Sequence, residues 1–169
     1  VASFSGFTYV TATNNGAKLT PISSIVTEEG QEPGYYSQAI VPADSDITEV
    51  SQLAGSSIAA TKATDPYFFL LQALAEAGLS EDDVEIQNVQ HADGLALLNG
   101  GSVQAWSGLD PIMAGAEVNS GAKLIYRNVD FNTYGFLNST EDFINNHGDV
   151  AQVVVDAYEK ARVWAIENP

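Results

Sequence analysis

The 169-residue chain carries 22 Asp and Glu residues against 6 Lys and Arg residues, a formal net charge of −16, and it has no cysteine. Nucleic acids and anionic membranes are bound through clustered basic residues, so this charge argues against both partners. The lack of cysteine excludes disulfides, thiol catalysis and cysteine-ligated metals, and no apolar run approaches the about 20 residues that span a bilayer.

The first forty residues predict a strand, a helix and two further strands. Ser3 and Ser5 lie in a segment, residues 3–6, that is expected to close a strand and open a helix with serine as its N-cap. Asn-Asn-Gly at 14–16 is a typical helix end. Strands are expected within 19–27 and over 35–41, on either side of a polar turn at 28–34.

The next stretch alternates strand and helix patterns, which predicts an α/β fold of βαβ units around a parallel sheet. The expected strands cover residues 57–61, 84–89, 103–106 and 122–126, and the expected helices cover residues 67–77, 93–98 and a segment that starts at 111. Ligands of open α/β sheets bind outside the carboxyl ends of the strands. The site is therefore expected in the turns 61–65, 90–93 and 106–110.

Two helices of this stretch begin with an Asp-Pro pair. Asp65 is the expected N-cap of the first, with Pro66 as the first helical residue, and Asp110 with Pro111 repeats the arrangement. Helical spacing predicts a buried stripe on the first helix. The stripe consists of Tyr67, Leu70, Leu71 and Leu74.

The last forty residues predict a strand and two helices. The strand is expected at 134–137, a short helix over 139–146, and a final helix over 149–167. One apolar face of the final helix is expected to pack inward. It carries Val150, Val153, Val154, Ala157, Tyr158, Ala161 and Trp164.

Several segments together resemble the solute-binding proteins of ABC importers for sulfonates, taurine and nitrate. They are Ala39-Ile-Val-Pro-Ala-Asp-Ser-Asp-Ile, Leu53-Ala-Gly, Ile58-Ala-Ala-Thr-Lys, residues 70–86, Gly101-Ser-Val-Gln-Ala-Trp followed by Asp110-Pro111, and residues 147–169 with their Trp-Ala-x-x-Asn-Pro ending. The resemblance covers most of the chain from about residue 39 onward, and it is weaker over residues 3–27. The specificity lies in the order of these segments along the chain.

The resemblance implies a two-lobe fold of the type II periplasmic binding proteins. The small lobe is expected over 41–130, and the large lobe over 1–40 and 131–169, with a hinge at the two crossovers. Family members are longer at both ends, so the large lobe is expected to be incomplete in this chain.

The resemblance also implies a function. We expect a non-enzymatic monomer that captures a small organic anion or zwitterion by cleft closure and presents it to a membrane permease. No cofactor and no metal are expected. The expected location is periplasmic or extracellular, either free or anchored as a lipoprotein.

Backbone N–H groups at helix starts are a natural site for an anion. By the resemblance, Thr61 and Thr64 are ligand contacts, as are Ser3 and Ser5 more weakly, and Lys62 adds positive charge. Two aspartates and one tryptophan have two interpretations each. Asp65 and Asp110 are either ordinary helix caps, which we favour, or partners of a ligand ammonium group. Trp106 either lines the cleft or packs in the core.

Two alternative functions stay open. In a small α/β enzyme, Asp65, His91 and Asp110 act as acid and base. In a regulator, the same fold senses an effector. A metal site is disfavoured because His147 is the only other histidine of the chain.

Overall fold

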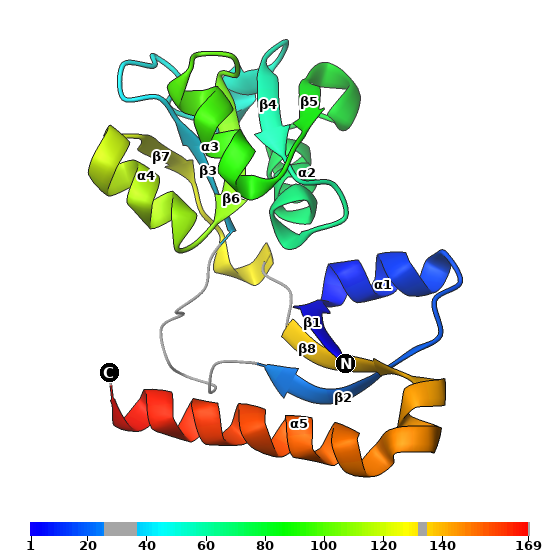
Figure 1. The fold of residues 1–169 in the computed structure, drawn as a ribbon. Coiled ribbons are helices and arrows are strands. Elements are labelled where there is room, and N and C mark those ends of the chain that lie inside the picture. Colours follow the sequence, from blue (N-terminus) through cyan, green and yellow to red (C-terminus); the bar gives the residue numbers. More distant parts are fainter. Residues whose placement is uncertain (26–36, 132–134, 169) are drawn as a thin grey trace. The chain divides into compact units, whose positions relative to one another are not determined.

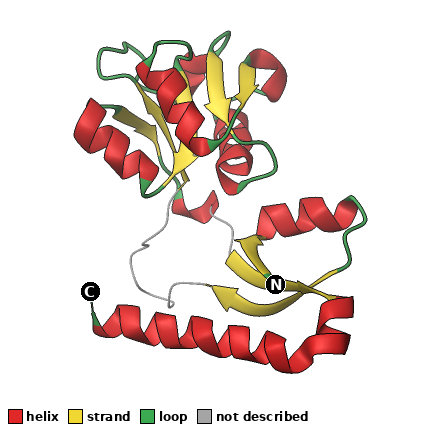
Figure 2. Cartoon of the chain, viewed as in Figure 1, coloured by secondary structure: helices red, strands yellow, loops and turns green. Residues whose placement is uncertain are grey.

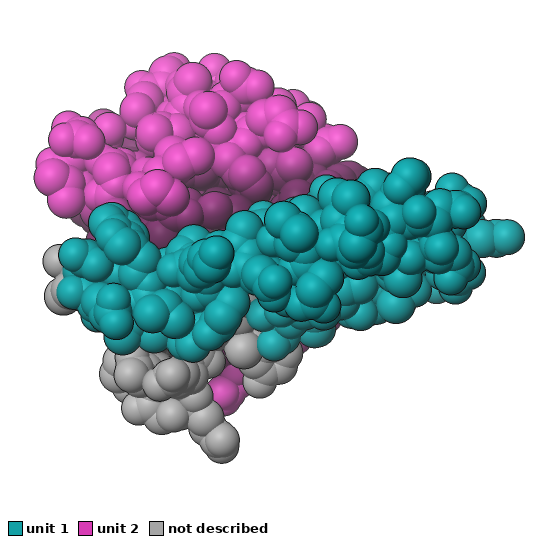
Figure 3. All heavy atoms as spheres, turned by 60° about the horizontal axis from the view of Figure 1, so that its bottom comes forward, with its two compact units in different colours: residues 1–28, 133–169 teal, residues 29–132 magenta. Residues whose placement is uncertain are grey.

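The computed structural model describes residues 1–25, 37–131 and 135–168. The chain divides into two compact units, a central unit of residues 29–132 and a terminal unit of residues 1–28 and 133–169 (Figure 3). Each unit has its own sheet and helices, which are coloured by type in Figure 2. The predicted turn at 28–34 and parts of the strands predicted at 35–41 and 134–137 lie outside the described residues.

The central unit is built on a five-stranded sheet with the order β5-β4-β6-β3-β7 (Figure 1). Its strands are β3 (Ser37–Val41), β4 (Ser57–Ala60), β5 (Glu85–Asn88), β6 (Ala105–Leu109) and β7 (Lys123–Tyr126). Strand β4 is parallel to β5 and β6, which confirms the predicted βαβ units, whereas β3 is antiparallel to β6 and β7. Strands β4, β5 and β6 therefore end at one edge of the sheet, where β3 begins. We call it the carboxyl edge.

Helices cover both faces of this sheet. They are α2 (Asp65–Glu76), α3 (His91–Asn99) and α4 (Ile112–Ser120), and the short 3-10 turns are η1 (Val50–Leu53), η2 (Glu81–Asp83) and η3 (Val129–Phe131). One buried cluster joins α2 to the sheet and includes Ile58, Phe69, Leu70 and Leu74. A second cluster joins α3 and α4 to the sheet and includes Ile40, Ala59, Leu98, Trp106 and Met113.

Several predicted boundaries in the central unit are wrong. Helix α2 begins at Asp65 with Thr64 as its N-cap, so Asp65 is not the cap and Pro66 is not the first helical residue. Helix α3 begins at His91, which places Asp93 inside its first turn. Strand β6 extends to Leu109 because it pairs with β3, a distant segment whose partnership no local pattern reveals.

Trp106 lies in the second cluster and is only 1% exposed. A Cβ atom on Gly94 of α3 would lie 2.5 Å from its Nε1, and one on Gly108 would lie 2.5 Å from its Cζ2. The indole thus occupies the space that side chains at both glycines would fill. The observed Trp106 ring is therefore packed in the core, which is the second of its two interpretations.

The terminal unit contains a three-stranded antiparallel sheet with the order β1-β8-β2. Its elements are β1 (Ala2–Ser5), α1 (Gly6–Asn14), β2 (Leu19–Ile25), β8 (Gly135–Thr140) and α5 (Glu141–Glu167). Ser5 caps α1 as predicted, because its Oγ accepts a hydrogen bond of 3.2 Å from the N–H of Thr8. The chain turns after the helix at Gly16, whose φ of +90° suits glycine.

The predicted break between the two last helices is confirmed as a kink inside α5. His147 has non-helical backbone angles, φ −143° and ψ 41°, between two helical stretches. The predicted inward face is wrong in part, since Val153 and Trp164 are 65% and 64% exposed and Ala151 is the buried residue of this helix. No helix in the described part of the chain is long and apolar enough to cross a bilayer.

Candidate functional site

The turn that follows β4 is fixed by the end of β5. The hydroxyl of Thr61 donates a hydrogen bond of 2.6 Å to the carbonyl of Val89, and the N–H of Lys62 donates one of 2.9 Å to Oδ1 of Asn88. Both predicted turns of this region, 61–65 and 90–93, therefore meet at the carboxyl edge. Asn88, which sequence reasoning missed, is the side chain that anchors the backbone of Lys62.

The same turn contains an unusual backbone conformation. Ala63 has a φ of +64°, in the left-handed region that residues other than glycine rarely adopt. The hydroxyl of Thr64 donates a hydrogen bond of 2.6 Å to the carbonyl of Thr61 and so closes the turn around Ala63. Strained backbone of this kind is concentrated at ligand sites, where the surrounding contacts hold it in place.

His91 lies at the first position of α3 and reaches the same turn. Its Nδ1 is 3.3 Å from Oγ1 of Thr61. Because the single hydroxyl proton of Thr61 is given to Val89, the imidazole is the donor in this contact, which assigns the Nδ1–H form. In the neutral ring Nε2 is then an acceptor, and it donates to a bound anion only when His91 is protonated.

We expect the stability of the protein to fall as the pH drops below about 6.5, because burial lowers the pKa of His91. Between the folded and unfolded pKa values the unfolded chain binds one more proton at this residue, so the free energy of unfolding rises with pH in that window. Urea unfolding of the wild type and of His91→Gln between about pH 5.5 and 7.5 measures this slope. The slope should be smaller in H91Q.

The matched control is His147→Gln, which removes an exposed imidazole from α5. H147Q should keep the slope of the wild type. Equal slopes in the wild type and H91Q would show that His91 is not the buried titrating group.

The side chain of Lys62 is paired with η2. Its Nζ lies 2.9 Å from Oε1 of Glu81 and 5.6 Å from the centre of the Tyr67 ring. Tyr67 donates a second hydrogen bond of 2.8 Å to Oε2 of Glu81. The bonds from Lys62 and then Tyr67 lower the pKa of Glu81, so the charge of Lys62 already has a partner.

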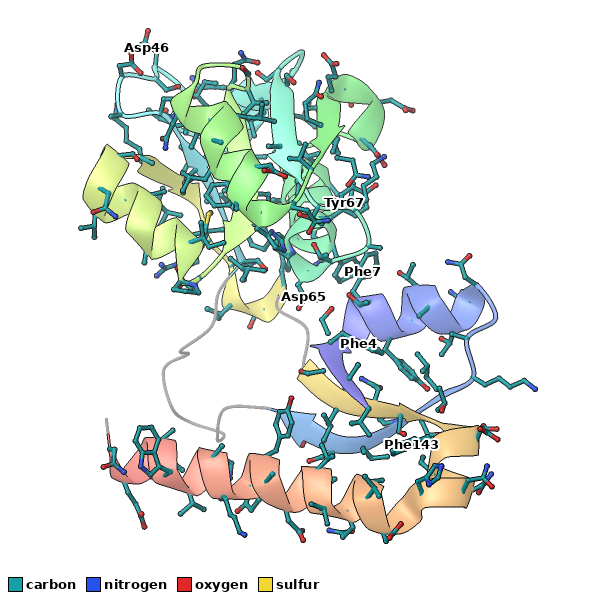
Figure 4. The ribbon with its side chains drawn as sticks, viewed as in Figure 1. Phe4, Phe7, Asp46, Asp65, Tyr67 and Phe143 are labelled. Carbon is teal, nitrogen blue, oxygen red and sulfur yellow. The ribbon has the colours of Figure 1, made fainter. Side chains whose placement is uncertain are left out.

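Two carboxylates lie at the helix starts that follow β4 and β6. Asp65 is 6% exposed and stands in the first turn of α2, where Figure 4 labels it. Asp110 follows β6, and its Oδ1 accepts a hydrogen bond of 3.0 Å from the N–H of Ala114 in α4. The N-cap of α4 is Pro111 and the helix begins at Ile112, so the predicted N-cap position of Asp110 is wrong, although its carboxylate still bonds to the first turn. The hydroxyl of Ser107 donates a hydrogen bond of 2.7 Å to the carbonyl of Pro66, which links β6 to α2.

The remaining predicted contacts, Ser3 and Ser5, belong to the terminal unit. Ser3 lies on β1 opposite Leu137 of β8, and the hydroxyl of Ser5 is 3.1 Å from that of Thr8 in α1. The predicted site residues of the central unit thus come together at the carboxyl edge, except that the Trp106 ring is buried beneath it. The two serines lie in the other unit, Ser3 within β1 and Ser5 at the start of α1.

Sequence reasoning missed the part of the carboxyl edge that β3 and β7 provide. Gln38 of β3 lies opposite Gly108 of β6 and is 1% exposed. Nη2 of Arg127, the residue after β7, donates a hydrogen bond of 3.1 Å to Oε1 of Gln38. The available signal was weak: a polar Ser-Gln pair opens an otherwise apolar strand at residue 37.

Buried polar side chains of the central unit gather at this edge. Among its described residues these side chains are Ser37, Gln38, Thr61, Asp65 and Ser107. Their concentration gives the edge the chemistry of a small polar ligand site, with hydroxyl, amide, imidazole and guanidinium groups over a packed core. No group of three or more potential metal ligands occurs among the described residues.

Comparison with known proteins identifies the class. Residues 1–114 match the family described as ABC transporter, phosphonate, periplasmic substrate-binding protein, so the chain belongs to this family. It is 28% identical to a putative aliphatic sulfonates-binding protein of Escherichia coli over 123 residues, which are 72% of this chain and 39% of the relative. It is 31% identical to the phosphate-import protein PhnD of Mycolicibacterium smegmatis over 121 residues, 71% of this chain and 33% of that protein.

The fold agrees with this membership. The alkanesulfonate-binding protein SsuA from Xanthomonas axonopodis pv. citri, solved with MOPS, matches with a TM-score of 0.81 and 24% identity over 94% of this chain and 54% of that one. The predicted α/β fold of type II binding proteins is confirmed, as is the family resemblance. The chain spans about half the length of this solved structure and 39% of the sulfonate-binding relative.

Proposed function

We propose that this chain is a solute-binding component of an ABC importer that captures a small organic anion. The preferred class is an aliphatic sulfonate or a taurine-like zwitterion. Membership of the periplasmic substrate-binding family supports the importer role, and the names of the relatives support an oxyanion ligand. The ligand is bound and released without chemical change.

The observation that carries this proposal is the set of buried polar side chains at the carboxyl edge. Burying hydroxyl and amide groups is costly unless they have partners, so a fold rarely collects them at one edge without use. Here they surround a strained turn, the start of α2 and the imidazole of His91. Backbone N–H groups at the start of a helix and a protonated imidazole are donors that suit sulfonate or phosphonate oxygens.

The division into lobes follows from the same proposal. Residues 41–130 form the small lobe, and residues 1–40 and 131–169 contribute to the large lobe, with the two crossovers as the hinge. The compactness of the unit 29–132 supports this assignment. Closure of the lobes on the ligand creates the surface that a membrane permease recognises. The protein works as a monomer in the periplasm or outside the cell, free or as a lipoprotein.

A thermal-unfolding screen tests the ligand class. The panel contains alkanesulfonates, taurine, alkylphosphonates, inorganic phosphate, nitrate, carboxylates and simple amines. A ligand present at 100 times its dissociation constant adds about 2.7 kcal/mol of stability, a shift that is easily measured. We expect the sulfonates to raise the unfolding temperature. A shift only with phosphonates or phosphate would replace sulfonate as the ligand class, and no shift with any anion would overturn the proposal.

A further inference from the structure

We infer that Asn88 is a positioning residue that sets the affinity of the proposed site without touching the ligand. It does so by holding the turn between β4 and α2, residues 61–64, in its strained conformation. The inference rests on the proposed function, because Thr61 and Thr64 of this turn are expected ligand contacts.

Three hydrogen bonds hold this turn. The hydroxyl of Thr61 donates 2.6 Å to the carbonyl of Val89, and the hydroxyl of Thr64 donates 2.6 Å to the carbonyl of Thr61. The third bond, of 2.9 Å, runs from the N–H of Lys62 to Oδ1 of Asn88. Of these three, only the last depends on a side chain outside the turn, so it can be removed without altering an expected ligand contact.

The register of the sheet places Asn88 at this position. Strands β4 and β5 are parallel, and Ala60 pairs with Asn88 where both strands end. The Asn88 side chain therefore lies level with the end of β4, within reach of the N–H two residues further along. Asn88 and Lys62 are both exposed, so without the amide oxygen this N–H bonds to water at little cost in stability.

The residue that needs this support is Ala63. Its φ of +64° lies in the left-handed region, which the Cβ of an alanine disfavours by a factor of about 5 to 30 in an unconstrained chain. The Asn88 bond fixes the N–H of the residue before Ala63, and the Thr64 hydroxyl closes the turn after it. When one of these contacts is lost, only the fraction of molecules that keeps the left-handed turn binds a ligand as before.

The conformation of Ala63 also directs a hydrogen-bond donor. The N–H of Thr64 makes no hydrogen bond within the part of the chain that the structure describes. Because its peptide group follows Ala63 directly, the backbone angles of Ala63 set the direction in which this N–H points. The hydroxyl protons of Thr61 and Thr64 are already given to carbonyls, so this N–H is a donor that the turn has left for a ligand.

Isothermal titration with ethanesulfonate and ethylphosphonate tests the inference on four proteins: the wild type, Asn88→Ala, the double variant Asn88→Ala with Ala63→Gly, and Asn99→Ala. Loss of the Asn88 bond should weaken binding of the better probe by about 3- to 10-fold, the factor by which one such hydrogen bond shifts a conformational equilibrium. Asn99 is exposed and is the last residue of α3. N99A makes the same chemical change there and should bind within about twofold of the wild type.

The double variant separates positioning from direct contact. Glycine adopts a positive φ without the steric cost that a Cβ brings, so Ala63→Gly restores the left-handed turn when Asn88 no longer enforces it. The double variant should therefore bind within about twofold of the wild type. Neither a direct contact between Asn88 and the ligand nor a general role in stability would be restored by a glycine at residue 63.

The outcomes separate this inference from the proposed function. If the wild type binds neither probe nor any other anion of the screen, the proposed function fails and the inference fails with it. An anion of the screen that binds in place of both probes is titrated instead. If the wild type binds but N88A binds as N99A does, or if the double variant stays as weak as N88A, the inference alone is overturned. N88A should unfold at the temperature of the wild type, and a clear drop would make Asn88 a structural residue instead.

Discussion

Replacing Trp106 by alanine is expected to lower the free energy of unfolding by about 3–5 kcal/mol. The indole is 1% exposed and fills the space above two glycines, Gly94 of α3 and Gly108 of β6. Neither glycine has a side chain that could move into the cavity, so little of the lost packing can be recovered. Urea denaturation followed by circular dichroism measures the loss.

The second tryptophan of the chain is the matched control. Trp164 is 64% exposed on α5, so Trp164→Ala should change the free energy of unfolding by no more than about 0.5 kcal/mol. The same two variants address the other interpretation of Trp106, in which the ring lines a ligand cleft. A Trp106→Ala protein with near wild-type stability and lost affinity would restore that interpretation.

The local pattern of the sequence was sufficient for the βαβ units. Helix α2 is found where an Asp-Pro pair precedes an apolar stripe, and Leu70 and Leu74 are buried as predicted. The other two stripe positions are only half-buried, since Phe69 and Ala73 face the sheet instead. A run of neighbouring aromatic and aliphatic residues predicts that a helix is buried. It does not determine which of two adjacent residues faces the sheet.

The long-range pairing of strands could not be predicted from the sequence. The antiparallel strand β3 joins β6 and β7, segments more than sixty residues further along the chain, and this pairing extends β6 past its predicted end. The site shows the same limit. Thr61 and Thr64 could be found because they follow a strand directly, whereas Arg127 and Gln38 are 89 residues apart and only the register of the sheet joins them.

The predicted packing of the final helix was wrong for a related reason. The apolar positions of 149–167 have helical spacing, which predicts a buried face if a partner surface exists. Within the terminal unit α5 packs mainly on β8 and β2, and Val153 and Trp164 stay largely exposed. Periodicity describes the helix, but the burial of its face depends on what other segments supply.

Removing the charge of Asp65 should make simple alkanesulfonates bind about tenfold tighter. Asp65 is 6% exposed at the start of α2, and an anion bound two strand spacings of about 4.8 Å from its carboxylate would be about 10 Å from a like charge. Like charges at that distance repel by about 1.7 kcal/mol at an effective dielectric constant of about 20. Titration of Asp65→Asn with ethanesulfonate and with taurine measures the effect.

Taurine distinguishes the two interpretations of Asp65. If the carboxylate is the partner of a ligand ammonium group, D65N should lose affinity for taurine while it gains affinity for ethanesulfonate. If Asp65 acts only through its charge at the helix start, both ligands should gain. Asp93→Asn, the same change at an exposed position in the first turn of α3, should leave both affinities unchanged. Unchanged affinities in D65N as well would mean that the anion binds far from α2, outside the carboxyl edge.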